Sequence, residues 1–198
     1  MKVDTILDFW FGATANDAVV AKQQAALWWS KNKDTDDDIR RRFQDCLRAA
    51  AHGELENWLA TARGRLASII LLDQFPRNIY RDTAEAFSYD GKALALSLEG
   101  LDLGMDRQLR PIERVFFYLP LEHSESLAHQ ERSVECFSDL VASVAAEQES
   151  IFEEYLNFAV RHRDIIARFG RFPHRNEILR RGSTPEESTF LAEPGSAF

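Results

Sequence analysis

Apolar residues recur at helical spacing along almost the whole of this 198-residue chain. Positions Ile39, Phe43, Cys46, Leu47 and Ala50, for example, fall on one face of a helix with 3.6 residues per turn. The alternation of apolar and polar residues that marks a strand is convincing nowhere. The pattern therefore predicts an all-α protein, and the length fits a single domain over residues 1–198.

Capping residues and prolines divide the chain into helices with short connections. Asn16 is a typical N-cap, Gly53 is a typical C-cap, and Thr184 begins a capping box. We interpret Pro76 as the residue that stops one helix and Pro120 as the residue that opens a long one. The predicted helices lie at about residues 4–11, 17–29, 39–52, 66–75, 83–100, 111–119, 121–144, 150–169 and 184–191. Short turns between helices predict antiparallel neighbours.

The stretch from Leu66 to Leu72 is apolar on all sides, which predicts a central helix covered by its neighbours. Asp73 follows in the last turn, where a carboxylate meets the negative end of the helix dipole. We expect an arginine to compensate this charge. Arg77, Arg81 and the arginines near the C-terminus are the candidates.

Composition and charge limit the classes of function. The net charge of -8 argues against nucleic acid as a partner, because binding phosphates needs a basic face. No apolar run approaches the roughly 20 residues that cross a bilayer, and the first residues lack the pattern of a secretory signal. Cys46 and Cys136 have no metal-binding or redox spacing. We expect a cytoplasmic protein with reduced thiols and no membrane partner.

One short phrase occurs twice, as Asp73-Gln74-Phe75-Pro76-Arg77-Asn78 and as Arg168-Phe169-Gly170-Arg171-Phe172-Pro173-His174-Arg175-Asn176. Each copy places Phe-Pro and Arg-Asn where an apolar helix is expected to stop. Polar groups beside a buried helix end are costly unless they are paired, so we expect each copy to have partners. The two copies lie too far apart for a tetratricopeptide period of 34 residues, and no shorter repeat is present.

These phrases carry a resemblance to a known family. Together with Asp8-Phe9-Trp10-Phe11-Gly12 and Leu119-Pro120-Leu121-Glu122-His123-Ser124-Glu125, they resemble domain-of-unknown-function family 924 over essentially the whole chain. The resemblance implies a bacterial protein with a tetratricopeptide-like αα superhelix of antiparallel helix pairs. It implies no activity and no catalytic residue.

The opening of the predicted long helix holds Glu122, His123 and Glu125. A helix N-terminus depresses the basicity of histidine and neighbouring glutamates oppose that effect, so His123 is expected to titrate near neutrality. This turn has two interpretations, acid–base chemistry or helix capping with hydrogen bonds between helices. Glu125 and His129 are also spaced to share a metal, but the second Glu-x-x-His motif of a ferritin-like site is absent.

A basic island from Arg161 to Arg181 contains seven arginines, together with His162 and His174. In an acidic chain this reversal indicates either an anion site or internal pairing with acids such as Asp73 and Glu122. The aromatic groups around Trp10, Trp28 and Phe116 are interpreted as core, with a ligand groove as the alternative.

No phosphate loop, nucleophile elbow or zinc motif is present, and we expect no cofactor and no metal. Two functions remain: a binding module for a protein or peptide, and a small-molecule protein or enzyme acting on a carboxylate or phosphate ligand. The predicted polar cluster, either a ligand site or a structural clasp, consists of Asp73, Gln74, Arg77, Asn78, Glu122, His123, Glu125, His162, Arg168, Arg171, His174, Arg175 and Asn176.

Overall fold

The computed structural model describes residues 1–196, and every regular element in that part of the chain is a helix. The α-helices are α1 (Val3–Phe11), α2 (Asp17–Trp29), α3 (Lys33–Ala51), α4 (Ala62–Ile79), α5 (Asp90–Asp102), α6 (Pro111–Glu122), α7 (Leu127–Ser143), α8 (Ala146–Phe169) and α9 (Pro185–Leu191). Short 3-10 turns are η1 (Glu56–Ala60), η2 (Ala84–Phe87), η3 (Asp106–Gln108) and η4 (Pro173–Arg175). The all-α prediction is confirmed for the described residues.

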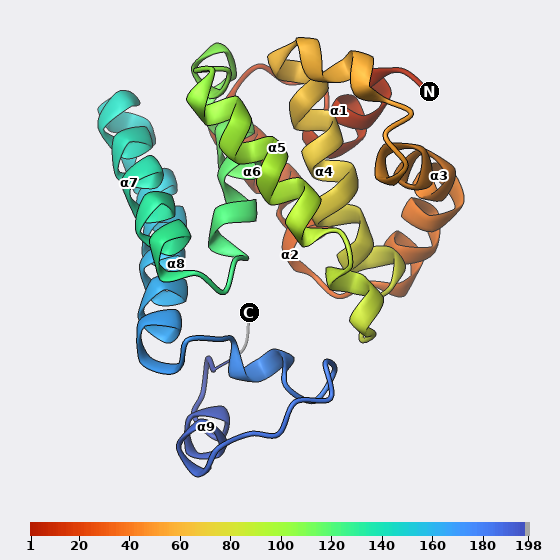
Figure 1. Ribbon diagram of the computed structural model, residues 1–198. Coiled ribbons are helices and arrows are strands. Elements are labelled where there is room, and N and C mark those ends of the chain that lie inside the picture. Colours follow the sequence, from red (N-terminus) through yellow and green to blue (C-terminus); the bar gives the residue numbers. More distant parts are fainter. Residues whose placement is uncertain (197–198) are drawn as a thin grey trace.

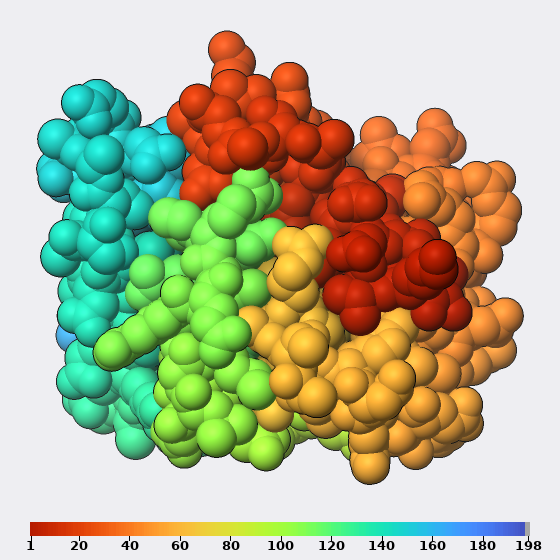
Figure 2. All heavy atoms as spheres, turned by 90° about the horizontal axis from the view of Figure 1, so that it is seen from above, coloured from red at the N-terminus to blue at the C-terminus, as the bar shows by residue number. Residues whose placement is uncertain are grey.

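Helices that follow one another in the chain pack against one another. Helix α4 contacts α3 and α5, while α7 contacts α6 and α8. In Figure 1, α7 and α8 stand at one side of the molecule, α3 at the other, and α4, α5 and α6 between them. The face seen in Figure 2 combines the N-terminal helices, in red, with residues near 100–110, in green, and with α7 at one edge.

Helix α4 is the central element that its apolar sequence predicts. All of its residues except Arg63 and Arg77 are buried. Thr61 caps its N-terminus by accepting a hydrogen bond from the Gly64 N–H at 3.1 Å. The last turns of this helix carry Asp73, which is fully buried, and Arg77, which is partly exposed.

Aromatic side chains surround the end of α4. Phe75 lies with its ring centroid 5.5 Å from that of Trp10, which is in turn 5.5 Å from Phe116. Trp28 packs on the same group, and its indole donates a hydrogen bond to the Trp10 carbonyl at 3.0 Å. These rings form core, as predicted, whereas Trp29 at the end of α2 is 51% exposed.

Two helices continue past the prolines that were expected to bound them. Helix α4 runs through Pro76 to Ile79, and the Tyr80 N–H still donates to the Pro76 carbonyl at 2.9 Å. Helix α6 likewise contains Pro120 in its last turn and ends at Glu122. Both prolines are buried, and a proline near a helix end forfeits only one backbone hydrogen bond, which tertiary packing offsets.

Two further boundaries differ from the predicted ones. Helix α3 begins at Lys33, with Asn32 as its N-cap, rather than near residue 39. The acidic residues between these positions belong to its first turns, where negative charge is favoured by the helix dipole. The helix expected from about residue 83 to 100 is divided into η2 and α5, which starts at Asp90. No helix among residues 1–196 is long and apolar enough to cross a membrane.

The C-terminal segment after α8 passes below the helices in the view of Figure 1. Gly170 ends α8 in the left-handed conformation, with φ of 68°, which glycine adopts without steric cost. The chain then forms η4 and reaches α9, whose capping box at Thr184 is present as predicted.

Candidate functional site

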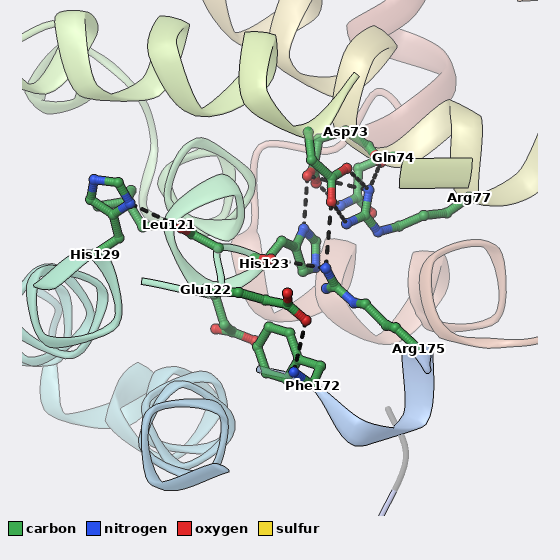
Figure 3. A network of polar contacts seen from close by, with 12 residues as sticks. Asp73, Gln74, Arg77, Leu121, Glu122, His123, His129, Phe172 and Arg175 are labelled. Carbon is green, nitrogen blue, oxygen red and sulfur yellow. Dashed lines mark hydrogen bonds and ion pairs between the residues drawn. The ribbon is translucent and has the colours of Figure 1, made fainter. Parts of the chain in front are cut away.

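Asp73 is the centre of a buried polar cluster where α4, α5, α6 and η4 meet (Figure 3). Its side chain is fully buried and accepts hydrogen bonds from Gln74 and from Nδ1 of His123, the latter at 2.7 Å. Arg77 Nη1 lies 3.4 Å from Asp73 Oδ1, so the expected arginine partner is present. Burial alone would raise the pKa of Asp73, but Arg77 and His123 hold it well below its ordinary value. Asp73 is therefore an ionised carboxylate.

His123 presents one ring nitrogen to Asp73 and keeps the other uncommitted. Because an ionised carboxylate only accepts hydrogen bonds, Nδ1 of His123 carries the proton and donates it to Asp73. Nε2 then has a lone pair, and the bond to Asp73 is the hydrogen bond that the ring makes within residues 1–196. Burial, reinforced by the charge of Arg77, lowers the pKa of His123 below its ordinary value. The ring is therefore neutral at pH 7.

The position of His123 on its helix differs from the predicted one. His123 is the C-cap of α6, and the long helix α7 begins only at Leu127. The predicted N-terminal turn was wrong because Pro120 does not start a helix. Its dipole argument is therefore reversed, since a helix C-terminus favours cations rather than carboxylates. The lowered basicity of His123 comes from burial and Arg77 instead.

Glu122 is a second buried acid, and its environment is the opposite of that of Asp73. Its Oε1 lies 3.1 Å from Nδ1 of His162, while Oε2 is buried and has no hydrogen-bond partner in the described part of the chain. Burial and the nearby charge of Asp73 raise the pKa of Glu122 to about 8. Burial also lowers the pKa of His162 to about 3. Glu122 is thus a protonated acid beside a neutral imidazole at pH 7.

Two arginines flank the histidine, and they are paired to different extents. Arg77 binds Asp90 through two hydrogen bonds, Nη1 to Oδ1 at 2.9 Å and Nη2 to Oδ2 at 3.0 Å. Arg175 lies 3.7 Å from Asp90 Oδ2 and donates to the backbone carbonyl of His123 at 3.1 Å. No carboxylate in residues 1–196 is within hydrogen-bond distance of Arg175, and its buried Nε has no partner there.

Aromatic rings hold Arg175 in place. Its guanidinium carbon lies 4.8 Å from the ring centroid of Phe87 and 4.5 Å from that of Phe172. Such cation–π contacts favour a positive charge. Burial and the charge of Arg77 nevertheless lower the pKa of Arg175 to about 10. The side chain is a cation held between two rings, and its carboxylate partner, Asp90, lies 3.7 Å away.

Glu125 fastens the C-terminal segment to this region. It accepts two hydrogen bonds from Arg181, at 2.6 and 2.9 Å, and one from the Phe172 N–H at 2.8 Å. Burial would raise the pKa of Glu125, but these donors hold it below its ordinary value. Glu125 is committed to structure, and His129 bonds to Ser124 at 2.9 Å. No group of metal-binding side chains occurs within residues 1–196.

The other predicted site residues have partners of their own. Asn78 donates to Asp36, to which Arg81 also binds. Asn176 donates to Glu187 at 3.3 Å and is not hydrogen-bonded to Asp73. His174 has its ring 5.5 Å from Phe172, and burial lowers its pKa to about 4.

The basic island consists mainly of internally paired arginines. Their carboxylate partners lie within 2.6–2.9 Å and are Asp164 for Arg163, Glu186 for Arg168, Glu187 for Arg171 and Glu125 for Arg181. Arg175 differs from them in having its carboxylate at 3.7 Å. The internal-pairing interpretation therefore holds for these four arginines, and Arg175 is paired more loosely, with Asp90.

Sequence reasoning missed Asp90 and Phe87. Asp90 supplies the counter-charge of Arg77, and Phe87 is one of the two rings on Arg175. Both come from the η2–α5 connection, where nothing in the local pattern indicates an approach to the end of α4. We define the Asp73 cluster as Asp73, Arg77, Asp90, Glu122, His123 and Arg175.

Comparisons with known proteins agree with the resemblance seen in the sequence. The model of a family described as bacterial protein of unknown function (DUF924) matches residues 6–195. The solved structure of the protein of unknown function ATU0120 from Agrobacterium tumefaciens is 39% identical to this chain. That match covers 96% of each chain with a TM-score of 0.81. None of the curated proteins compared with the chain matches it.

Proposed function

The chain belongs to the bacterial family of unknown function DUF924, and from its geometry we propose that it binds a small anionic ligand at the Asp73 cluster. The ligand class is a carboxylate or phosphate compound. The observation that carries this proposal is Arg175, a buried guanidinium with no carboxylate within hydrogen-bond distance among residues 1–196. A buried cation of this kind is costly until an anion pairs with it.

The surroundings of Arg175 support an anion as its partner. The guanidinium is fixed by two rings and by the carbonyl of His123, so little conformational entropy is lost when a ligand binds. The side chains of Arg77 and Asp90 are each 21% exposed and that of His123 is 14% exposed. Parts of these three side chains therefore reach the surface.

A thermal-shift titration with inorganic phosphate and with malonate tests the proposal. A ligand that binds only the native state raises the melting temperature, by an amount that grows as RT ln(1 + [L]/Kd). We expect Arg175→Ala to abolish this rise. Arg168→Ala is the matched control, because Arg168 belongs to the same segment but pairs with Glu186. If Arg175→Ala keeps the full rise, the anion binds elsewhere and the proposal is wrong.

A second candidate function is an interaction module built on a tetratricopeptide-like superhelix of antiparallel helix pairs. The observation in its favour is Trp29, which is 51% exposed and stacks on Phe116 with ring centroids 5.8 Å apart. Exposed tryptophans often anchor protein interfaces. Selection of peptides from a displayed random library, followed by loss of binding in Trp29→Ala, would support this function. Unchanged binding by that variant would exclude Trp29 as the anchor.

A further inference from the structure

We propose that the Asp73 cluster also turns over its ligand, with His123 as a general base in the hydrolysis of an ester whose acid part carries an anionic group. This inference rests on the proposed anion binding at Arg175 and extends it from binding to catalysis. It is carried by three features of the cluster: an oriented imidazole, an uncommitted ring nitrogen and a neighbouring guanidinium whose carboxylate partner lies 3.7 Å away, beyond hydrogen-bond distance.

The imidazole of His123 is oriented as a base must be. Asp73 accepts from Nδ1 at 2.7 Å and so fixes both the tautomer and the plane of the ring. The backbone of His123 is held as well, since its N–H donates to Leu119 at 2.9 Å and its carbonyl accepts from Arg175 at 3.1 Å. Nε2 is therefore presented at one fixed place with its lone pair available. Asp73 is a positioning residue in this scheme.

The base acts on water rather than on a protein nucleophile. The nearest hydroxyl in the sequence, that of Ser124, pairs with Nδ1 of His129 at 2.9 Å. No serine, threonine or cysteine side chain within residues 1–196 hydrogen-bonds to the ring of His123. A covalent acyl-enzyme is therefore not part of the scheme, and the attacking group is a water molecule activated by Nε2.

The reaction balances with the residues of the cluster. Nε2 of His123 removes a proton from water as the water oxygen attacks the ester carbonyl carbon, and the carbonyl electron pair moves to its oxygen. The tetrahedral intermediate then collapses and breaks the bond to the leaving alkoxide, which takes the proton back from His123. Arg175 holds the anionic group of the acid part, so that the ester carbonyl is kept beside the base.

The charge state of the surroundings suits a neutral base. The ionisable groups around His123 come from several elements, namely Asp73 and Arg77 of α4, Asp90 of α5, Glu122 of α6, His162 of α8, and His174 and Arg175 of η4. Protonated Glu122 and neutral His162 add no charge at pH 7. Asp73 and Asp90 are both carboxylate partners of Arg77, and burial together with Arg77 keeps the imidazole unprotonated.

The experiment compares two esters on the full chain, mono-4-nitrophenyl succinate and the neutral 4-nitrophenyl acetate. We expect release of 4-nitrophenolate from the succinate ester, with kcat/KM rising with pH through a single pKa below 7 and then levelling off. His123→Asn keeps an N–H donor for Asp73 but lacks Nε2, and it should lower kcat by at least ~100-fold. Asp73→Asn should lower kcat by roughly 10- to 100-fold, because the base loses its orientation.

Arg175→Lys separates binding from chemistry. It should raise KM for the succinate ester several-fold, a larger change than its effect on kcat, because a lysine lacks the planar fork of arginine. His52→Asn is the matched control, since the side chain of His52 is 71% exposed and lies outside the cluster. Its rate should equal that of the wild type.

Three results would overturn the inference. They are a wild-type rate that merely follows hydroxide concentration, an equal loss of rate in His52→Asn, and full activity in a folded His123→Asn variant. The pH profile of the wild type needs no variant, so the test holds even if a substitution prevents folding. If malonate still stabilises the wild type while neither ester is hydrolysed, hydrolysis is wrong and the proposed anion binding stands.

Discussion

The two Phe-Pro phrases share their residues but differ in what those residues bind. Phe75-Pro76-Arg77-Asn78 lies in the last turn of α4, whereas Phe172-Pro173-His174-Arg175-Asn176 forms the η4 turn beyond α8. Both phenylalanines are fully buried and both prolines are covered. The apolar half of each phrase is thus anchored in the same way, and the difference lies in the polar half.

The two phrases differ in the partners of their arginines. Arg77 has two carboxylates, Asp90 in a two-point hydrogen bond and Asp73 at 3.4 Å. Arg175 has aromatic rings and a carbonyl, with its carboxylate at 3.7 Å. An arginine that completes its own charge balance stabilises the fold, whereas one that does not is available to a ligand. The charges of the first phrase therefore stabilise the fold, and the second phrase is the one that we propose to bind an anion.

The largest expected effect comes from the carboxylate that the first phrase supplies. Asp73→Ala leaves buried Arg77 with one of its two acids and removes the partner of His123, at a cost of roughly 3–5 kcal/mol in the free energy of unfolding. Urea denaturation followed by circular dichroism at 222 nm measures it. A loss below about 1 kcal/mol would mean that Asp73 is not the electrostatic centre of the cluster.

The two arginines should differ in the next experiment. Arg77→Ala strands Asp73 and Asp90 without their cation and should cost about 3 kcal/mol. Arg175→Ala removes cation–π contacts but strands no carboxylate, so we expect a cost of about 1 kcal/mol. The same urea titration measures both. Equal losses would make Arg175 a structural clasp and would remove the contrast between the phrases.

Glu122 should make the free energy of unfolding depend on pH. Its pKa is raised to about 8 in the fold, so the native state binds more protons than the unfolded chain between about pH 4.5 and 8. Its contribution to stability is fully present below that window and is lost as the pH rises through it. Relative to Glu122→Gln, the wild type should lose roughly 4 kcal/mol between pH 5 and 9. Parallel stability curves for the two proteins would show that Glu122 ionises normally.

The asparagines should give the smallest difference between the two phrases. Asn176 donates to Ser183 and Glu187 and accepts from Arg181, whereas within residues 1–196 the side chain of Asn78 donates only to Asp36. We expect about 1 kcal/mol for Asn78→Ala and about 2 kcal/mol for Asn176→Ala. Thermal unfolding monitored by calorimetry resolves this difference. The reverse order would mean that the bonds of Asn176 are replaced by water.

The sequence predicts the fold class and the central helix because both depend on local periodicity. The apolar run before Asp73 indicates a covered helix, and α4 is buried at all but two positions. The caps at Asn16 and Thr184 are also local, and both form the expected side-chain bonds. Pro76 and Pro120 were interpreted wrongly because tertiary burial, which no local pattern encodes, allows a helix to continue through them.

The site could be predicted only in part. An acid at the end of an apolar helix implies a cation nearby, and Arg77 is one turn away. The pairing with His123 requires the end of α6 to meet the end of α4, which depends on how the helices pack. Asp90 and Phe87 are joined to the site by the same packing, so sequence reasoning had no means of finding them.

Arg175 donates a hydrogen bond to the carbonyl of His123, a residue that precedes it in the chain. This contact also sets the order in which the site is completed. During synthesis α4 and α6 emerge from the ribosome before residues 172–181 are made, and N-terminal parts of a chain generally fold first. Asp73 and His123 can pair in such a nascent chain, but the cation that would hold an anion arrives only with η4, 52 residues after His123. A growing or prematurely ended polypeptide therefore carries the base without the anchor. The proposed chemistry is thereby restricted to chains whose translation has reached the C-terminal segment.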